Sequence, residues 1–566
     1  MSVGMRAGAA IIATGLCLTL VAGCGGGASK SGVGTAPSQT TSNAVNQMVA
    51  TPRADMKSGG SMTWALSQTI PNFNYYEVDG TLQDNTYVLN ALLPNPFHFD
   101  AAGNPTVDTD YFSSIVQKSS SPLVIEYTIN PKATWSDGTR ISWVDLASLW
   151  RASSGANPAF DISADTGYNQ IRSVTAGANA QQAVVTFSKP FTDWQGLFSP
   201  LVPRTLTATP AAFNTGWTDH PLVTAGPFNW GSQDKTAQTY TVVRNPKWWG
   251  DPAELNKIVF AAYDDPSAAV QALGTHEVDY DDISLGDTAG NIAAAKSYSG
   301  IDIRQAPGNN YRQFTFNTKD PLLSDLKVRQ AILLGIDRAK ITTALIGRLG
   351  GNPTPLDNNL FMKNQAAYAA TCGSYCAYNP GQAKQLLESD EWTLVGGTFE
   401  KGGKPLTLTI TIPASTPNAT SEAEVAQNSL AAAGIKLAIS SVPTNDFFSK
   451  YIDAGKFQLT TFTWIGTSFP VGGALSIFKY DPSSVGQNYG SGGSDEINAL
   501  LGEAASAPNA KAEAVLANRA SQAMWANAAW LPLYQRPQIV AANSKLVNIG
   551  APGFADIRYQ DVGYVS

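Results

Sequence analysis

The sequence has few of the residues on which many catalytic and metal sites depend. Only three histidines occur in 566 residues, and no His-Glu-x-x-His motif is present. There is no Gly-x-Ser-x-Gly elbow, and Gly402-Gly403-Lys404-Pro405 lacks the Ser or Thr of a phosphate loop. A carboxylate pair stays open, because 44 acidic residues occur and no spacing favours one. We therefore expect a protein that is not an enzyme and that carries neither a cofactor nor a metal.

Charge is also scarce. Charged residues make up 14% of the chain, and the net charge is −7 with no basic run, which argues against a nucleic-acid partner. Beyond the first two dozen residues no uncharged apolar stretch is long enough to cross a bilayer. A chain of this length exceeds what one hydrophobic core usually fills, so we expect at least two lobes.

The N-terminal residues have the pattern of a secretion signal. One positive charge, at Arg6, precedes an uncharged run of small and apolar residues. Leu20-Val21-Ala22-Gly23-Cys24 resembles the bacterial lipobox, in which the cysteine is acylated. We expect a lipoprotein signal at residues 1–23, lipidation of Cys24 and a flexible tether at 24–58. The chain would then lie at the outer face of the cytoplasmic membrane; the alternative is an ordinary signal peptide that happens to contain Cys24.

Two of the four cysteines, Cys372 and Cys376, lie outside the signal region and close together. Outside the cytoplasm such a pair favours a small disulfide loop over a metal site. A zinc site would need two further ligands nearby, and the sequence shows none.

Strands and helices alternate along the rest of the chain. Residues 123–129 alternate apolar and polar side chains, and residues 183–187 and 240–243 also have strand patterns. Ser324, Asp337 and Asn379 are placed to cap helices, and residues 420–433 form a further one that Gly434 ends. The stretch from Leu406 to Val442 predicts a βαβ unit with parallel strands. The pattern predicts α/β lobes plus an antiparallel segment between residues 100 and 220.

Several ordered motifs resemble the peptide-, dipeptide- and nickel-binding proteins of ABC importers, family 5 of the solute-binding proteins. Within that family the chain looks most like actinobacterial oligopeptide-binding lipoproteins, and the similarity covers nearly all of residues 59–566. The motifs that carry it are Trp135-Ser-Asp137-Gly138-Thr139, Thr224-Ala-Gly226-Pro227-Phe228, Arg244-Asn245-Pro246-Lys247-Trp248-Trp249, Leu326-Lys-Val328-Arg329-Gln330-Ala331-Ile332 and Tyr378-Asn-Pro-Gly-Gln-Ala-Lys-Gln-Leu-Leu387.

The resemblance implies an α/β, two-lobed periplasmic-binding-protein-like fold of type II, cluster C, with an additional domain. Residues 59–98, 222–317 and 531–566 would form lobe I, residues 99–221 its extra subdomain, and residues 318–530 lobe II. The chain would cross between the lobes near 316–319 and 530–534.

The resemblance also implies the function. The chain would capture oligopeptides or peptide-like solutes by closure of its lobes, and deliver them to the permease of an importer whose ATPase is a separate subunit. We expect a monomer. Two alternatives stay open: a binder of haem or another amphipathic ligand, and a regulatory lipoprotein that transports nothing.

Two segments, residues 75–80 and residues 463–470, are candidates for the ligand site, because an exposed strand edge can bind the main chain of a peptide. In relatives an Asp in the second segment binds the ligand's α-amino group, but Thr467 stands there. Either another carboxylate, such as Asp79, Asp281 or Asp282, takes its place, or the ligand has no free amino terminus. The aromatic candidates can equally be core residues, and the asparagines ordinary turn residues. The expected ligand-binding residues are Tyr75, Tyr76, Asp79, Gly80, Asp282, Asn310, Tyr311, Trp464, Ile465, Gly466, Thr467 and Ser468.

Overall fold

A computed structural model describes residues 46–284, 289–349, 353–414, 416–482 and 487–565, which belong to one compact unit. Cys24 and most of the expected tether lie outside these residues. Among the described residues, no helix has both the length and the apolar character needed to cross a membrane.

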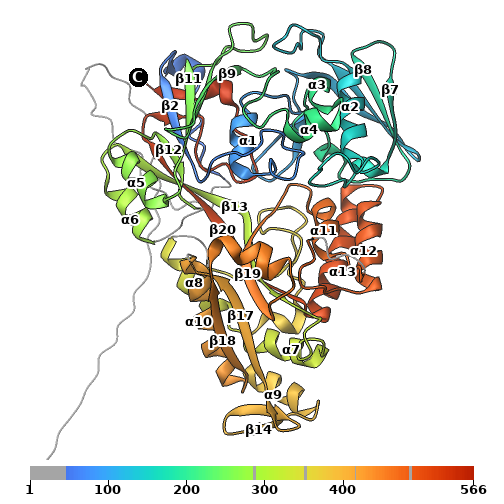
Figure 1. The fold of residues 1–566 in the computed structure, drawn as a ribbon, viewed down its shortest axis with the longest axis vertical. Coiled ribbons are helices and arrows are strands. Elements are labelled where there is room, and N and C mark those ends of the chain that lie inside the picture. The colour runs from blue at the N-terminus through green and yellow to red at the C-terminus, as the bar shows by residue number, and fades with distance from the viewer. Residues whose placement is uncertain (1–45, 285–288, 350–352, 415, 483–486, 566) are drawn as a thin grey trace, which may run out of the picture. The chain divides into compact units, whose positions relative to one another are not determined.

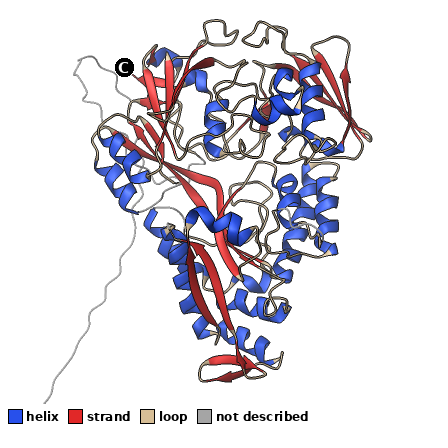
Figure 2. Ribbon diagram, viewed as in Figure 1, coloured by secondary structure: helices blue, strands red, loops and turns tan. Residues whose placement is uncertain are grey.

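One sheet of ten strands runs through the whole unit (Figures 1 and 2). Two of its central strands, β13 and β20, are long and pair with each other over most of their length. In sheet order the strands are β18 (Lys436–Val442), β17 (Thr407–Pro413), β19 (Leu459–Ile465), β13 (Ile301–Phe316), β20 (Trp530–Asn543), β12 (Tyr280–Asp282), β2 (Ser61–Leu66), β11 (Lys257–Ala262), β10 (Thr239–Arg244) and β9 (Phe228–Asp234).

The sheet divides into two parts that β13 and β20 share. β12, β2, β11, β10 and β9 lie on one side and form the sheet of lobe I. β19, β17 and β18 lie on the other side and form the sheet of lobe II. The predicted βαβ unit is confirmed here, because β17 and β18 pair in parallel and helix α10 (Pro417–Ala432) connects them.

A separate antiparallel sheet lies beside lobe I, as the pattern between residues 100 and 220 predicts. Its order is β5 (Phe112–Ser120), β6 (Leu123–Ile129), β8 (Gln182–Phe187) and β7 (Ile171–Ala176). Alternate side chains of β6 are buried, which matches the period of two in its sequence. Helix α2 (Trp143–Ser153) packs on it; its first turn is capped where Asp145 accepts a hydrogen bond from the backbone N–H of Ser142, 2.9 Å long.

Helix starts follow the side chains that can cap them. Asp337 and Asn379 cap α8 (Arg338–Leu345) and α9 (Pro380–Glu388), as predicted. The predicted cap at Ser324 is wrong by one residue, because Asp325 accepts the hydrogen bond from Lys327 N at the start of α7 (Leu326–Gly335). The other helices are α1 (Gln83–Leu89), α3 (Arg204–Thr207), α4 (Pro210–Thr215), α5 (Pro266–Gly274), α6 (Ala289–Ser297), α11 (Pro470–Phe478), α12 (Asp495–Ala505) and α13 (Ala510–Asn527).

Smaller elements complete the unit. The short strands are β1 (Met56–Lys57), β21 (Leu546–Val547) and β22 (Gly563–Val565) in one sheet, β3 (Phe97–Phe99) and β4 (Pro105–Val107) in another, and β14 (Thr393–Val395), β15 (Thr398–Lys401) and β16 (Lys404–Pro405) in a third. Single helical turns occur at Arg53–Asp55, Tyr168–Gln170, Trp194–Gly196, Gly347–Leu349, Gly373–Cys376, Thr444–Asp446, Phe447–Ile452 and Tyr559–Asp561.

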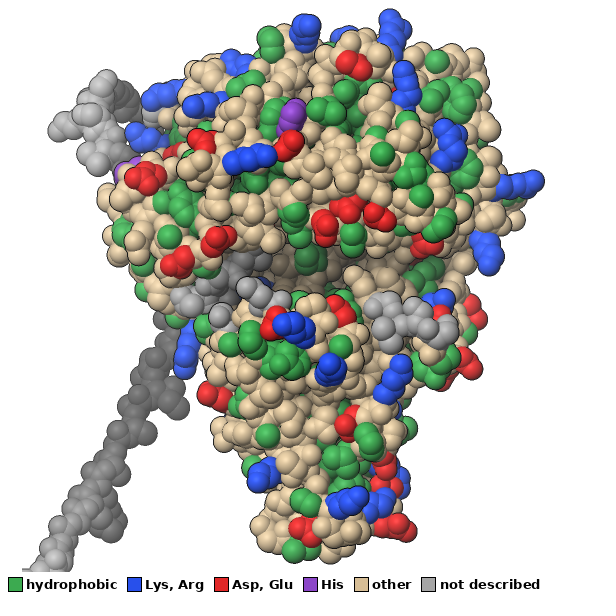
Figure 3. All heavy atoms as spheres, viewed as in Figure 1, with side chains coloured by type: hydrophobic (Ala, Val, Ile, Leu, Met, Phe, Trp, Pro, Cys, Tyr) green, Lys and Arg blue, Asp and Glu red, His purple; other side chains and the backbone are tan. Residues whose placement is uncertain are grey.

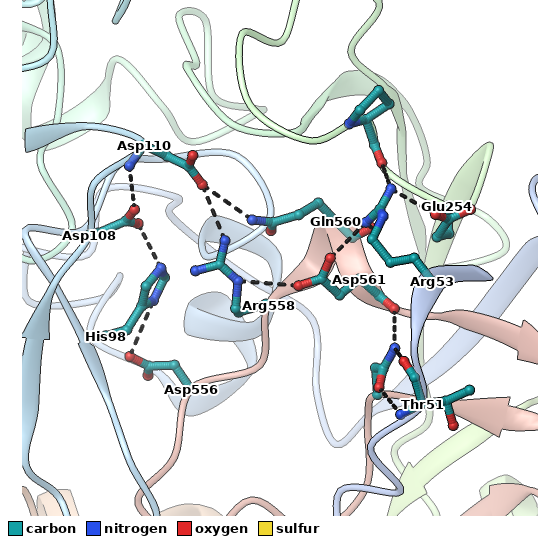
Figure 4. A network of polar contacts seen from close by, with 12 residues as sticks. Thr51, Arg53, His98, Asp108, Asp110, Glu254, Asp556, Arg558, Gln560 and Asp561 are labelled. Atoms are coloured by element: carbon teal, nitrogen blue, oxygen red, sulfur yellow. Dashed lines mark hydrogen bonds and ion pairs between the residues drawn. The ribbon is translucent and has the colours of Figure 1, made fainter. Parts of the chain in front are cut away.

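The segment from Gln47 to Lys57 belongs to the fold, which differs from the expected tether over residues 24–58. Arg53 forms ion pairs with Glu254, at 2.7 Å, and Asp561, at 2.6 Å (Figure 4). Met56 pairs with Val565 in β22. The sequence of this segment is poor in large apolar residues, and polar contacts rather than burial of side chains hold it to lobe I.

Candidate ligand-binding cavity

A cavity of about 290 Å³ lies where the two shared strands leave their regular pairing. β13 and β20 pair from Ile301 to Pro307 and again from Tyr311, with a shift of register between. Gly308, Asn309 and Asn310 of β13 and Arg536 and Pro537 of β20 line the cavity at this break. Figure 3 shows the surface hollowed along a band between the upper and lower parts of the molecule.

Close backbone approaches shape this wall. A Cβ atom on Gly308 would lie 2.6 Å from the carbonyl oxygen of Arg536, and one on Gly466 would lie 2.5 Å from that of Asn309. Gly466 N donates a hydrogen bond to Asn309 O, 2.8 Å long. Glycine therefore lets the end of β19 lie directly against β13 at the cavity.

The end of β19 and Asn310 together form an exposed wall of the cavity. Ile465 is 53% exposed at the end of β19, and Thr467 and Ser468 follow it along the cavity. Asn310 lines the same wall, and its buried Oδ1 has no hydrogen-bond donor among the described residues. A buried amide oxygen without a donor is costly, so this atom is a ready acceptor for a ligand N–H.

Acidic and basic groups meet at the lobe I side. Asp282 Oδ2 accepts a hydrogen bond from Gln538, 2.9 Å long, and Ser284 also donates to this carboxylate. Burial raises the pKa of Asp282. Arg536 is 6% exposed and donates to the carbonyl oxygen of Ser284, so the cavity has a cation and a carboxylate close together.

A third charged group of the wall, Asp556, connects the cavity to a polar network (Figure 4). His98 lies between Asp108, 2.9 Å away, and Asp556, 3.9 Å away. Burial lowers the pKa of His98, but the neighbouring carboxylates of Asp108 and Asp556 outweigh it and raise the pKa to about 9. The network continues through Asp110, Arg558 and Asp561.

Seven of the predicted ligand-binding residues line this one cavity, although they come from four separate parts of the chain. They are Tyr75, Asp282, Asn310, Ile465, Gly466, Thr467 and Ser468. The segment at Tyr75 and the segment at 465–468 therefore face the same space.

The other five predicted residues do not line the cavity. Tyr76 is buried and donates to the carbonyl oxygen of Pro200, and Asp79 is exposed outside the cavity. Gly80 packs so tightly against Asn74 that a Cβ atom would lie 2.0 Å from its carbonyl oxygen. Tyr311 and Trp464 are cross-strand partners in an aromatic cluster behind the wall.

Several residues that line the cavity were not predicted from the sequence. Gln83, Thr86, Tyr87 and Asn90 follow one another at helical spacing on α1 and form one face toward the cavity. Arg536, Gln538 and the segment 552–557 also line it. The polar residues Gln535, Arg536 and Gln538 in an otherwise apolar strand were the available signal, whereas nothing in the sequence marks 552–557.

Cys372 and Cys376 lie together, with their Cα atoms 5.1 Å apart and their sulfur atoms within bonding distance. The carboxylate of Asp357 lies within 4.8 Å of both sulfur atoms. Arg338 already donates to this carboxylate, at 2.9 Å.

Two α/β lobes that share strands, with a cavity at the shared strands, define a type II periplasmic binding protein. The chain belongs to the bacterial extracellular solute-binding proteins, family 5, whose middle-region model matches residues 106–484. It is 37% identical to the oligopeptide-binding protein OppA of Mycobacterium tuberculosis H37Rv over 516 residues, which cover 90% of this chain and 86% of the relative.

Solved structures agree on the fold. A periplasmic EDTA-binding protein, EppA, matches with a TM-score of 0.83 and 26% identity, over 92% of this chain and 98% of that one. The oligopeptide-binding protein AppA from Bacillus subtilis, in complex with a nonapeptide, matches with a TM-score of 0.72 and 18% identity, over 90% and 100% of the two chains.

Proposed function

We propose that this protein captures oligopeptides, or peptide-like solutes, in the cavity between its lobes and delivers them to the permease of an ABC importer. The relative of 37% identity is named an oligopeptide-binding protein, and this chain matches it over most of both lengths. Binding rather than catalysis is the proposed activity, with no cofactor and with ATP hydrolysis on a separate ATPase subunit.

The single observation that carries the proposal is the wall formed by Asn310 and the end of β19. It combines an acceptor that lacks a donor with an exposed strand end, and these are the groups that an extended peptide main chain can bind. We propose ligand contacts for the seven predicted residues that line the cavity. For Tyr76, Asp79, Gly80, Tyr311 and Trp464, direct contact stays a prediction.

Thr467 stands where relatives have an acidic residue. We propose that Asp282 instead binds the ligand's α-amino group. Of the three carboxylates considered from the sequence, it is the one that lines this cavity. A bound ammonium would favour its charged form and offset the burial that raises its pKa.

Ligand capture would couple to movement about the shared strands. A ligand that contacts both lobes binds only when they are close together, so it shifts the population toward the closed form. We propose that the hinge is the break at Gly308–Asn310 and Arg536. The expected crossings, 316–319 and 530–534, lie at the lobe II ends of the same strands.

We further propose the lipid anchor at Cys24, a disulfide between Cys372 and Cys376, and a monomer tethered at the outer face of the cytoplasmic membrane. The variant Cys24→Ala should move from the membrane to the soluble fraction. Thiol alkylation and mass measurement of purified protein should find Cys372 and Cys376 blocked before reduction and reactive after it.

The experiment that tests peptide capture is mass spectrometry of ligands released when the purified protein is denatured. Peptides, together with calorimetric binding of a synthetic copy of one of them, would support the proposal. A released pigment, or the absence of any ligand together with no binding of a peptide library, would overturn it and favour an amphipathic ligand or a regulatory role.

A chelated metal is a second candidate ligand. It is favoured by the EDTA-binding structure, which matches with a higher TM-score than the peptide complex, and by the buried Arg536 at the cavity. Titration with iron(III)–EDTA in the same calorimeter separates the two candidates.

A further inference from the structure

A second, larger cavity lies next to the first. Its volume is about 570 Å³. One wall comes from the antiparallel sheet beside lobe I, and the other comes from α11, α13 and the loop before α13 in lobe II; the sheet and these helices lie next to each other in Figure 1. Ser468 lines both cavities. Phe99 of the first cavity and Phe469 of the second have ring centroids 5.5 Å apart.

The two parts of the protein are joined at this cavity by the segment at Thr192. Thr192 N donates to the carbonyl oxygen of Ala505, 2.8 Å long, at the end of α12. The neighbouring Asp193 is 5% exposed, and its Oδ2 accepts a hydrogen bond from Gly472 N, 2.5 Å long, in the first turn of α11. Asp193 is therefore fixed at the contact between the parts.

Glu513, near the start of α13, faces Asp193. Each carboxyl group is close enough to influence the pKa of the other, and Glu513 Oε1 is buried with no donor group in reach among the described residues. Two ionised carboxylates are both acceptors and repel each other, so a shared proton would stabilise the pair. Burial and the like charge of its neighbour raise the pKa of Glu513, and burial raises that of Asp193.

The rest of the lining complements a cation. Asp193 and Glu513 are the only charged or titratable side chains among the described residues that line the cavity, so no lysine or arginine neutralises them there. Four aromatic side chains share the lining: Phe191, Trp194, Phe361 and Phe469. Aromatic faces and carboxylates together suit a cationic group on an aliphatic stem.

We propose that the Asp193–Glu513 pair anchors a second cationic group of the ligand, the side chain of a lysine or arginine in a bound peptide. The inference rests on the proposed function, because it places the peptide's amino end in the first cavity and its chain past Ser468 into the second. The ammonium or guanidinium takes the place of the shared proton, which leaves to solvent. The protein thus selects peptides with a basic residue beyond the amino terminus.

The test uses two synthetic peptides that differ only in lysine against norleucine, which has the same apolar stem without the ammonium. Titration calorimetry with the full folded protein at pH 7.5, in two buffers of different ionisation enthalpy, measures affinity and proton release. We expect the lysine peptide to bind roughly tenfold or more tightly, with about one proton released. The norleucine peptide should release none.

Substitutions of Asp193 and Glu513 test whether this pair causes the preference for the lysine peptide. Glu513→Gln and Asp193→Asn should each reduce the lysine preference to about threefold or less while keeping the affinity for the norleucine peptide. Asp219→Asn, at an exposed site that lines neither cavity, should keep the full preference. Equal affinities of the two peptides for the unmodified protein would overturn this inference but not the proposed function. This comparison needs no variant, so it holds even if a variant fails to fold. Binding of neither peptide nor any other would overturn the proposed function.

Discussion

Arg312 of β13 and Glu422 of α10 form a buried ion pair, in which Arg312 Nη2 lies 2.6 Å from Glu422 Oε2. Tyr534 of β20 donates to the other oxygen, Oε1, also at 2.6 Å, and Thr461 of β19 donates to Oε2. One carboxylate thus ties a helix of lobe II to three neighbouring strands, two of which are shared with lobe I. It lies just beyond the break in β13 that lines the first cavity.

Removal of this carboxylate should destabilise the protein strongly. Glu422→Ala removes the carboxylate that neutralises the buried Arg312, and we expect the free energy of unfolding to fall by about 3–5 kcal/mol. Urea denaturation followed by tryptophan fluorescence measures the change. Glu424→Ala, on the exposed side of the same helix, is the matched control and should change stability by less than about 0.5 kcal/mol. A similar small loss in both variants would contradict the assigned role of the pair.

Loss of the proton from His98 should lower the stability of the protein as the pH rises above neutral. The pKa of His98 is raised to about 9, above its unfolded value of about 6.5, so the folded state binds the proton more tightly. The resulting stabilisation is complete below about pH 6.5 and is lost as the pH rises toward 9. The side chain is 27% exposed, so we expect about 1–3 kcal/mol rather than more.

Urea midpoints measured between pH 6 and 9.5 test this dependence. The unmodified protein should lose stability across that window, and His98→Gln should show a flatter profile because it cannot take up the proton. Identical slopes in both proteins would show that other groups cause the decline.

The fold could be predicted further than the site. Period-two burial in β6 and the helix between two apolar strands at 406–442 are local patterns, and both are confirmed. The long strand β13 could not be predicted, because Pro307-Gly308 has the sequence of a turn. Its extended course depends on pairing with β20, which is distant in sequence.

Of two predicted ligand-binding residues that are neighbours in a strand, only one lines the cavity. Successive side chains of a strand point to opposite faces, so Trp464 and Ile465 cannot both face one cavity, nor can Asn310 and Tyr311. The structure places Asn310 and Ile465, which are cross-strand partners, at the cavity, and the partners Tyr311 and Trp464 behind it. No sequence pattern distinguishes the two faces, because both carry residues suited to a ligand.

Gly466 should be required for the shape of the cavity wall. In Gly466→Ala the new Cβ atom would lie 2.5 Å from the carbonyl oxygen of Asn309, so the end of β19 has to move away from β13. We expect peptide affinity to fall by roughly tenfold or more and stability to fall by about 1–3 kcal/mol. Calorimetry and urea denaturation measure the two effects.

Gly473→Ala is the matched control for that substitution. Gly473 lies in α11, and a Cβ atom there meets nothing within 4 Å. We expect unchanged affinity and a gain in stability of about 0.5–1 kcal/mol, because alanine favours a helix interior. Unchanged affinity in Gly466→Ala as well would contradict a role for the β19 end in binding.

Asn310 should contribute to affinity without contributing to folding. Its Oδ1 has no donor among the described residues, so Asn310→Ala removes a buried acceptor that the folded chain does not use, and stability should stay the same or rise slightly. A ligand N–H that binds this oxygen would lose its partner, which predicts peptide affinity about tenfold lower by titration calorimetry. Asn169→Ala, at an exposed site outside both cavities, should leave affinity unchanged. Wild-type affinity in Asn310→Ala would mean that the ligand does not use this wall, and the cavity at the strand break would then lose its main support as the binding site.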